Sequence, residues 1–379
     1  MTRKVPGIGR LVVLVWLCAF ASFAQAVGLS RPTPQPPPHV MEPFFAPRGG
    51  SNYLWYALGP NCDREPYGIV PNYHLPGVRV LVQSQLAAMH VDGMTRLSLG
   101  VSFAHGFHSG TLVDSSDPAQ VAQVARNVAA LLDDVAAAGF RGVLFRFFPA
   151  GAISPPTPGY DVSLVNEHFG LIQAVRASLV ASGLNYLIDL SVEAAPRDSD
   201  FPYISDPWKY PANTDWSHGV RALWQLYYAA YGSADTIGFS SITDDDPDRM
   251  RSRVRHMRYV YDTGGGNPHY PGTFAIDVYG DFFADEAVKF RQYDGAMRSE
   301  DADGAMGWRD APVIVAETFY DDPVAAENLA AALNSTGRPV PFLTEWPLDR
   351  GADAATGASC SDVNVAPPYG WGAFLHYGF

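Results

Sequence analysis

The sequence predicts a (β/α)8 barrel, the TIM-barrel class of α/β proteins, and three observations favour it. Short apolar runs alternate with amphipathic helical segments along most of the chain. Several helical segments end at a glycine one to three residues before the next strand. The segments that lead from strand to helix are long and rich in aromatic residues. Short loops at one end and long loops at the other are typical of this barrel.

The first residues do not belong to the repeat. Residues 1–26 combine a basic start, an apolar run over 11–23 and an A-x-A site, which together predict a secretory signal peptide. Residues 27–47 are rich in proline and predict an extended linker. We therefore expect the barrel domain to span 48–379 and the protein to be secreted or periplasmic.

Composition excludes several kinds of partner. The formal net charge is −13, which argues against binding to nucleic acid or to an anionic membrane surface. No apolar run after the signal peptide is long enough to span a membrane, and we expect a monomer without a cofactor. Barrel closure places the first strand beside the eighth, so we expect a disulfide between Cys62 and Cys360, with two free thiols as the alternative.

The predicted elements alternate regularly. We expect strands at 53–58, 95–101, 142–148, 185–192, 235–242, 273–279, 312–319 and 340–346. We expect helices at 78–91, 118–138, 162–181, 216–231, 247–262, 282–298 and 323–335. An open doubly wound sheet is the alternative, but it would need a glycine-rich phosphate loop after the first strand, and 59–66 does not provide one.

Residues 311–348 show the repeating unit most completely. A buried apolar strand ends at Glu317, and Asp322-Pro323 then gives an N-cap followed by proline at the first helical position. Asp117-Pro118 and Asp246-Pro247 begin two other helices in the same way. The next strand ends at Glu345 and Trp346, and strand alternation turns one of the two inward, which we expect to be Trp346.

Polar and aromatic residues follow the predicted strand ends, where a barrel enzyme keeps its chemistry. They are Asn61, Asp63, Ser102, His105, His108, Arg146, Glu193, Asp244, Asp245, Tyr279, Asp281, Glu317, Glu345 and Trp346. A metal-dependent hydrolase would need His105, His108 and the acidic run 244–248 to converge on one point. We favour a simpler reading of that run, as carboxylates at a helix N-terminus with Asp246 as the cap.

Two carboxylates that face each other across an aromatic pocket suggest glycoside hydrolysis. In its layout the chain resembles clan A of the glycoside hydrolases, the "4/7" barrels, over nearly the whole mature chain. The residues that carry the resemblance are Glu193 on strand 4, Tyr279 on strand 6, Glu317 on strand 7, Trp346 on strand 8 and Arg96 on strand 2.

The resemblance implies a retaining glycoside hydrolase that acts on a poly- or oligosaccharide. Glu317 takes the position of the nucleophile and Glu193 that of the acid/base, with their carboxyl groups roughly 5–5.5 Å apart. Trp346, Tyr279 and Arg96 would bind substrate. We also expect His105 and Asp244 to contact the sugar, and we expect no metal.

One departure from the family pattern leaves alternatives open. Val192 precedes Glu193, whereas the family has asparagine before its acid/base. If the strand count slips by one, Asp244 or Asp245 becomes the candidate acid. A barrel that only binds glycan, in polysaccharide assembly or export, is the other alternative. It predicts no second carboxylate within reach of Glu317.

Overall fold

The structure is a computed structural model, and all of its described residues belong to the unit Pro38–Phe379. The described residues are 48–54, 68–155, 159–195, 215–263, 266, 268–346 and 369–379. The signal peptide, the linker, the Cys62–Cys360 pair, Asn61 and Asp63 lie outside them, so those expectations stay predictions.

Parallel pairing joins all the strands into one sheet. The strands are β1 (Gly49–Asn52), β2 (Arg96–Ala104), β3 (Leu112–Asp114), β4 (Gly142–Ala150), β5 (Asn185–Asp189), β6 (Thr236–Gly238), β7 (Ser241–Ile242), β8 (Phe274–Asp277), β9 (Val313–Glu317) and β10 (Leu343–Glu345). Their order is β6-β5-β4-β2-β1-β10-β9-β8-β7, with β3 beside β2. The first strand therefore neighbours the last, as the barrel prediction requires.

The sheet closes through one interrupted strand. β6 pairs with β5 and β7 pairs with β8, so these two short strands are the two ends of the hydrogen-bonded path. Only Phe239 and Ser240 separate them along the chain. The interruption follows Gly238, whose φ of 70° a residue with a side chain rarely adopts. β6 and β7 are thus the two halves of the fifth barrel strand, and the (β/α)8 prediction is confirmed.

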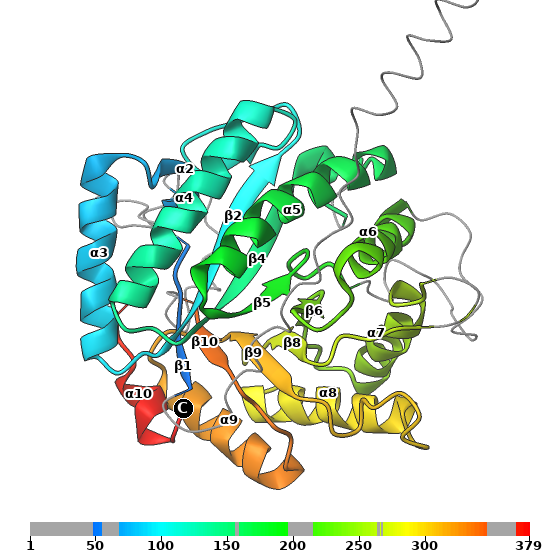
Figure 1. Ribbon diagram of the computed structural model, residues 1–379. Helices are drawn as coiled ribbons and strands as arrows, with labels where there is room; N and C mark the ends of the chain where they lie inside the picture. The colour runs from blue at the N-terminus through cyan, green and yellow to red at the C-terminus, as the bar shows by residue number, and fades with distance from the viewer. Residues whose placement is uncertain are drawn as a thin grey trace, which may run out of the picture. The chain divides into compact units, whose positions relative to one another are not determined.

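Helices cover the outside of the strands (Figure 1). They are α2 (Ile69–Asn72), α3 (Pro76–Val91), α4 (Pro118–Ala137), α5 (Val165–Ser182), α6 (Asp215–Tyr231), α7 (Pro247–Val260), α8 (Glu286–Glu300), α9 (Pro323–Thr336) and α10 (Gly372–His376). The three Asp-Pro starts are confirmed, because Asp117, Asp246 and Asp322 each accept a backbone N–H of the first helical turn. The glycines predicted to end helices all have positive φ, and they are Gly93, Gly139, Gly183, Gly232 and Gly337. None of the described helices is long and apolar enough to cross a membrane.

The core has two parts. The larger part lies between the strands and the helices. A smaller apolar cluster is separate from it and consists of Leu144, Leu187, Ile237, Ala275, Ile314, Ala316 and Phe342. These residues come from the barrel strands and alternate with residues of the larger core, so they fill the barrel interior. They form the floor on which the polar residues at the strand ends rest.

The position of the first strand differs from the expectation. The apolar stretch 53–58 was expected to be the strand, but β1 is Gly49–Asn52, and 55–58 lie outside the described residues. A Cβ atom on Gly50 would collide with the carbonyl oxygen of Arg96, and one on Gly49 would lie 2.5 Å from the carbonyl oxygen of Leu343. Close packing against the neighbouring strands therefore requires glycine in β1. For this reason the apolar content of the sequence does not predict where the strand lies.

The end of the chain packs on the barrel, as its aromatic content predicts. Trp371, Phe374 and Phe379 are buried, and the Trp371 ring fills the space beside Gly49. The Arg48 guanidinium lies 5.2 Å from the centre of the Phe379 ring. The C-terminal segment 369–379 therefore covers the strand at which the barrel begins.

Candidate active site

A layer of charged side chains rests on the apolar floor of the barrel. Along β4, β5 and β8, the residues two positions beyond Leu144, Leu187 and Ala275 are Arg146, Asp189 and Asp277. Residues two apart on a strand share one face, so these three side chains also point into the barrel. Each is at most 1% exposed. Buried charges at this depth require partners.

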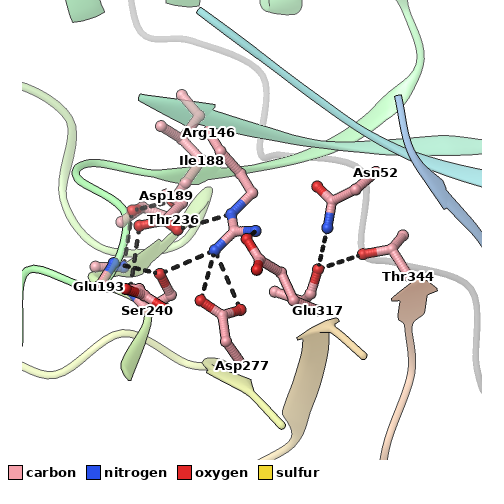
Figure 2. Close-up of polar contacts among 12 residues, drawn as sticks. Asn52, Arg146, Ile188, Asp189, Glu193, Thr236, Ser240, Asp277, Glu317 and Thr344 are labelled. Carbon is pink, nitrogen blue, oxygen red and sulfur yellow. Dashed lines mark hydrogen bonds and ion pairs between the residues drawn. The ribbon is translucent and has the colours of Figure 1, made fainter. Parts of the chain in front are cut away.

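Arg146 is the centre of the layer (Figure 2). Its Nε donates to Asp189 Oδ2 at 3.1 Å, and its Nη2 donates to Asp277 Oδ2 at 3.0 Å. Its Nη1 donates to Glu317 Oε1 at 2.5 Å. The planar guanidinium presents five N–H donors in a fixed geometry, whereas an ammonium group has three donors on a single nitrogen atom. Burial lowers the pKa of Arg146, but the three carboxylates outweigh it and raise the pKa above its usual value.

Glu317, the last residue of β9, is held at both carboxylate oxygens. Oε1 accepts from Arg146, and Oε2 accepts from the Tyr279 hydroxyl at 2.9 Å. Burial and the charge of Glu317 raise the pKa of Tyr279 well above its usual value, so the phenol keeps its proton and donates it. The carbonyl of Ala316 accepts from Asn52 Nδ2 at 2.5 Å and from Thr344 Oγ1 at 2.7 Å. The residue before Glu317 is thus fixed as well.

Glu193 reaches the same place from the turn after β5. One oxygen each of Glu193, Asp277 and Glu317 lie within 4.8 Å of one another. The backbone of Glu193 has a φ of 52°, in the left-handed region that a residue with a side chain rarely adopts. Such strain is characteristic of functional sites. The structure therefore brings together the two carboxylates that the strand layout singled out.

Asp277 is a third carboxylate of the site, and the sequence analysis did not select it. Burial raises its pKa well above the usual value, the charges of Glu317 and Glu193 add to this, and Arg146 opposes it. A signal for it exists in the sequence. The apolar strands VLFRFF, NYLID and FAID each contain one charged residue at an inward position. A charge inside an apolar strand predicts a buried ionic group, and three of them predict a cluster.

An aromatic pair lies at the end of the barrel strands. The rings of Trp346 and Phe148 are 6.4 Å apart, and both side chains are partly exposed. Trp346 directly follows β10 and lies two residues beyond Thr344, whose hydroxyl donates to the carbonyl of Ala316. This supports the inward position expected for Trp346. Glu345 lies on the other face, where its Oε2 accepts from the Asp321 amide at 2.7 Å.

Arg96 lies at the other end of the strands, and His105 and Asp244 pair with charged residues of α5 and α7. Arg96 is the first residue of β2, opposite Gly142 at the start of β4, so it lies at the amino end of the strands. Arg146, which pairs with Gly100 in the same register, supplies the arginine that Arg96 was expected to provide. The histidine His105 contacts the carboxylate of Glu167 on α5, with 2.8 Å between Nδ1 and Oε2.

Asp244 is paired with arginines of α7. Its two oxygens accept from Arg249 Nε at 2.9 Å and from Arg253 Nη2 at 3.0 Å. Burial opposes the effect, but the hydrogen bonds from Arg249 and Asp246 and the charge of Arg253 lower the pKa of Asp244 to about 2. A general acid must carry a proton near its working pH. The alternative that makes Asp244 the acid is therefore disfavoured, and Asp246 caps α7 as expected.

The positions of the described residues do not support the alternative of a metal-dependent hydrolase. Within the residues that the structure describes, the group of side chains close enough to share an ion consists of Glu193, Asp277 and Glu317. It contains neither His105 nor His108, nor a residue of the acidic run 244–248. Both oxygens of Asp277 already accept from Arg146 Nη2.

Comparison with known proteins gives a likeness in structure alone. No family model and no curated protein matches the chain. Solved structures that resemble it include a fungal β-1,4-galactanase, with 12% identity, a TM-score of 0.47 and coverage of 76% of this chain and 90% of that one. An exo-β-1,4-mannosidase from Opitutaceae bacterium strain TAV5 has 14% identity and a TM-score of 0.49, over 87% of this chain and 58% of that one. A β-mannanase from the blue mussel Mytilus edulis has 10% identity and a TM-score of 0.46, over 80% and 86%.

These structures are glycoside hydrolases, the class expected from the layout of the strand ends.

Proposed function

We propose that the protein is a secreted or periplasmic glycoside hydrolase that cleaves O-glycosidic bonds of a poly- or oligosaccharide with retention of configuration. One observation carries the proposal: oxygens of Glu193 and Glu317 lie within 4.8 Å of each other at the ends of the fourth and seventh barrel strands. Retaining enzymes hold their two carboxyl groups about 5–5.5 Å apart, and inverting enzymes hold them about 6.5–9.5 Å apart to admit a water molecule.

Glu317 is the proposed nucleophile. Its carboxylate accepts hydrogen bonds from Arg146 and Tyr279, and these two bonds fix the orientation of the group that attacks the anomeric carbon. When the covalent glycosyl–enzyme ester forms, the negative charge on Glu317 is consumed. Arg146 keeps its hydrogen bonds to Asp189 and Asp277, so the guanidinium retains partners after the ester forms.

Glu193 is the proposed acid/base. In the first step it protonates the departing glycosidic oxygen, and in the second step it removes a proton from the water that hydrolyses the ester. Its turn projects it from a different strand than Glu317, so the two carboxyl groups approach from separate sides of the barrel interior. The sugar ring would bind between them.

Trp346 and Phe148 supply an apolar wall for the sugar. Sugar rings present C–H groups that pack on aromatic faces, and both side chains are partly exposed at the carboxyl ends of their strands. The acidic chain favours a neutral glycan as the partner and disfavours nucleic acid.

The test is covalent trapping. The protein is incubated with a panel of 2-deoxy-2-fluoro glycosides that carry activated leaving groups, and peptides are analysed by mass spectrometry. We expect an adduct on Glu317 with one sugar configuration. Glu317→Gln should form no adduct and should lose turnover, whereas Glu345→Gln, the matched buried control, should retain both. Glu193→Ala should lose about 10²–10⁴-fold in kcat/KM on substrates with poor leaving groups.

Two outcomes would overturn the proposal. An adduct on a residue other than Glu317 would refute the assignment of the nucleophile. Absence of any adduct, together with glycan binding that Glu317→Gln leaves unchanged, would identify a barrel that binds carbohydrate without cleaving it.

A further inference from the structure

Ser240 lies in the interruption of the fifth barrel strand, between β6 and β7, and its side chain is completely buried. Its backbone amide donates to Asp189 Oδ1 at 3.1 Å. Gly238, two residues earlier, turns the chain with its positive φ. The interruption thus places the hydroxyl of Ser240 against the charged layer.

The hydroxyl of Ser240 joins the two halves of the site. Its oxygen accepts from the backbone amide of Glu193 at 2.9 Å and from Arg146 Nη2 at 3.2 Å (Figure 2). A serine hydroxyl has two acceptor lone pairs, and these two donors use both. One atom therefore connects the turn that carries Glu193 with the guanidinium that holds Glu317.

Glu193 needs such a connection because its backbone conformation is unfavourable. A residue with a side chain is less stable in the left-handed region than in the right-handed region, because its Cβ atom comes too close to the following carbonyl oxygen. The neighbours of Glu193 are held from either side, since the amide of Val192 donates to the carbonyl of Phe147 at 3.0 Å and Trp216 Nε1 donates to the carbonyl of Ala194 at 3.0 Å. The amide that Ser240 accepts belongs to the strained residue itself, so the bond acts where the strain lies.

We propose that Ser240 is a positioning residue for Glu193, an inference that rests on the proposed glycoside hydrolase activity. Its hydroxyl fixes the turn of the acid/base relative to Arg146 and hence sets the separation of the two carboxylates. Removal of the hydroxyl should impair proton transfer from Glu193. It should leave the attack of Glu317 nearly intact, because Arg146 and Tyr279 still hold that carboxylate.

The test compares two glycosides of the sugar that labels Glu317. A dinitrophenyl glycoside has a leaving group that departs without a proton, and a phenyl glycoside needs acid catalysis. For Ser240→Ala we expect kcat/KM on the phenyl glycoside to fall about 10- to 100-fold, because small displacements of an acid are costly. On the dinitrophenyl glycoside we expect a change of less than roughly twofold.

Ser241 offers a matched control. It is the next residue, it is equally buried, and its hydroxyl has no hydrogen-bond partner in the described part of the chain. Ser241→Ala should lower neither rate by more than roughly twofold. Ser240→Cys keeps the volume of the side chain but weakens the acceptor, so it should show the same split between the two glycosides if the alanine variant folds poorly.

Equal losses on both glycosides, with Glu317 still labelled in the wild type, would overturn the positioning role and leave the proposed function standing. Equal behaviour of Ser240→Ala and Ser241→Ala would also overturn it. Absence of any Glu317 adduct in the wild type would overturn both proposals.

Discussion

Replacement of Arg146 by methionine is the most severe single test of the charged layer. The change removes one cation from three carboxylates, two of which are completely buried and one of which is 9% exposed. Breaking one buried ion pair by removing a partner costs about 3–5 kcal/mol of unfolding free energy. Arg146 serves three partners, so we expect the loss at pH 7 to reach at least the upper end of that range, about 5 kcal/mol.

The loss should depend on pH in a defined direction. Burial already raises the pKa of Asp277 in the folded state above its unfolded value of about 4, and Arg146 opposes that rise, so loss of the cation raises the pKa of Asp277 further. A raised folded pKa gives stability that is complete below the unfolded pKa and is lost as pH rises through the folded pKa. Arg146→Met should therefore be closest to the wild type near pH 4.5 and furthest from it near pH 8.

Urea unfolding at pH 4.5, 6 and 8, followed by tryptophan fluorescence and circular dichroism together, measures both effects and checks two-state behaviour. Arg141→Met is the control, because Arg141 is exposed just before β4, and it should change the unfolding free energy by less than about 0.5 kcal/mol. Arg146→Lys keeps the positive charge but loses the planar set of N–H donors. Its loss of unfolding free energy should lie between those of Arg146→Met and Arg141→Met. A loss below about 1 kcal/mol at pH 7, or one independent of pH, would refute the reasoning.

Two further predictions concern single glutamates. Glu193→Asn should raise the unfolding free energy by about 1 kcal/mol while removing acid catalysis, because asparagine tolerates the left-handed region and the change removes one charge from the cluster. The same change at exposed Glu327 on α9 should not stabilise, and urea unfolding of both variants decides the matter. Burial raises the pKa of Glu345 well above its usual value and the charge of Asp321 adds to this, so its contribution to stability is complete below about pH 4 and is lost as pH rises. Glu345→Gln should thus gain stability relative to the wild type between pH 4.5 and 8, and a constant difference over that range would contradict the prediction.

Most of the fold was predictable because its signals are local. Each Asp-Pro pair and each exit glycine marks a helix end by its own conformational preference, without reference to the rest of the chain. The predicted helix bounds therefore agree with the structure to within a few residues at most ends. β1 was misplaced because its glycines are selected by the carbonyl oxygens of neighbouring strands, which no local pattern reveals.

The site was predictable in its carboxylates and less so in its cation. Glu193, Glu317 and Tyr279 follow from the rule that strand ends face the site, and the structure brings them together. The choice between Arg96 and Arg146 depends on depth along the barrel axis. Arg96 begins its strand, whereas Arg146 is the fifth residue of β4. The position of a residue along the barrel axis can be assigned only when the register between neighbouring strands is known.

The charged layer also divides the chain unequally. Arg146 and Asp189 come from the strands before the interruption at Ser240, and Asp277 and Glu317 come from the strands after it. The amino-terminal four βα units therefore hold the cation with one carboxylate, and the carboxyl-terminal four units hold two of its carboxylate partners. The two carboxylates of the carboxyl-terminal half therefore depend on a cation that only the amino-terminal half supplies to them, because Asp277 and Glu317 both contact Arg146. Assembly of the two halves is thus itself a recognition event, and a half barrel expressed alone would expose to water the charges that the whole barrel buries.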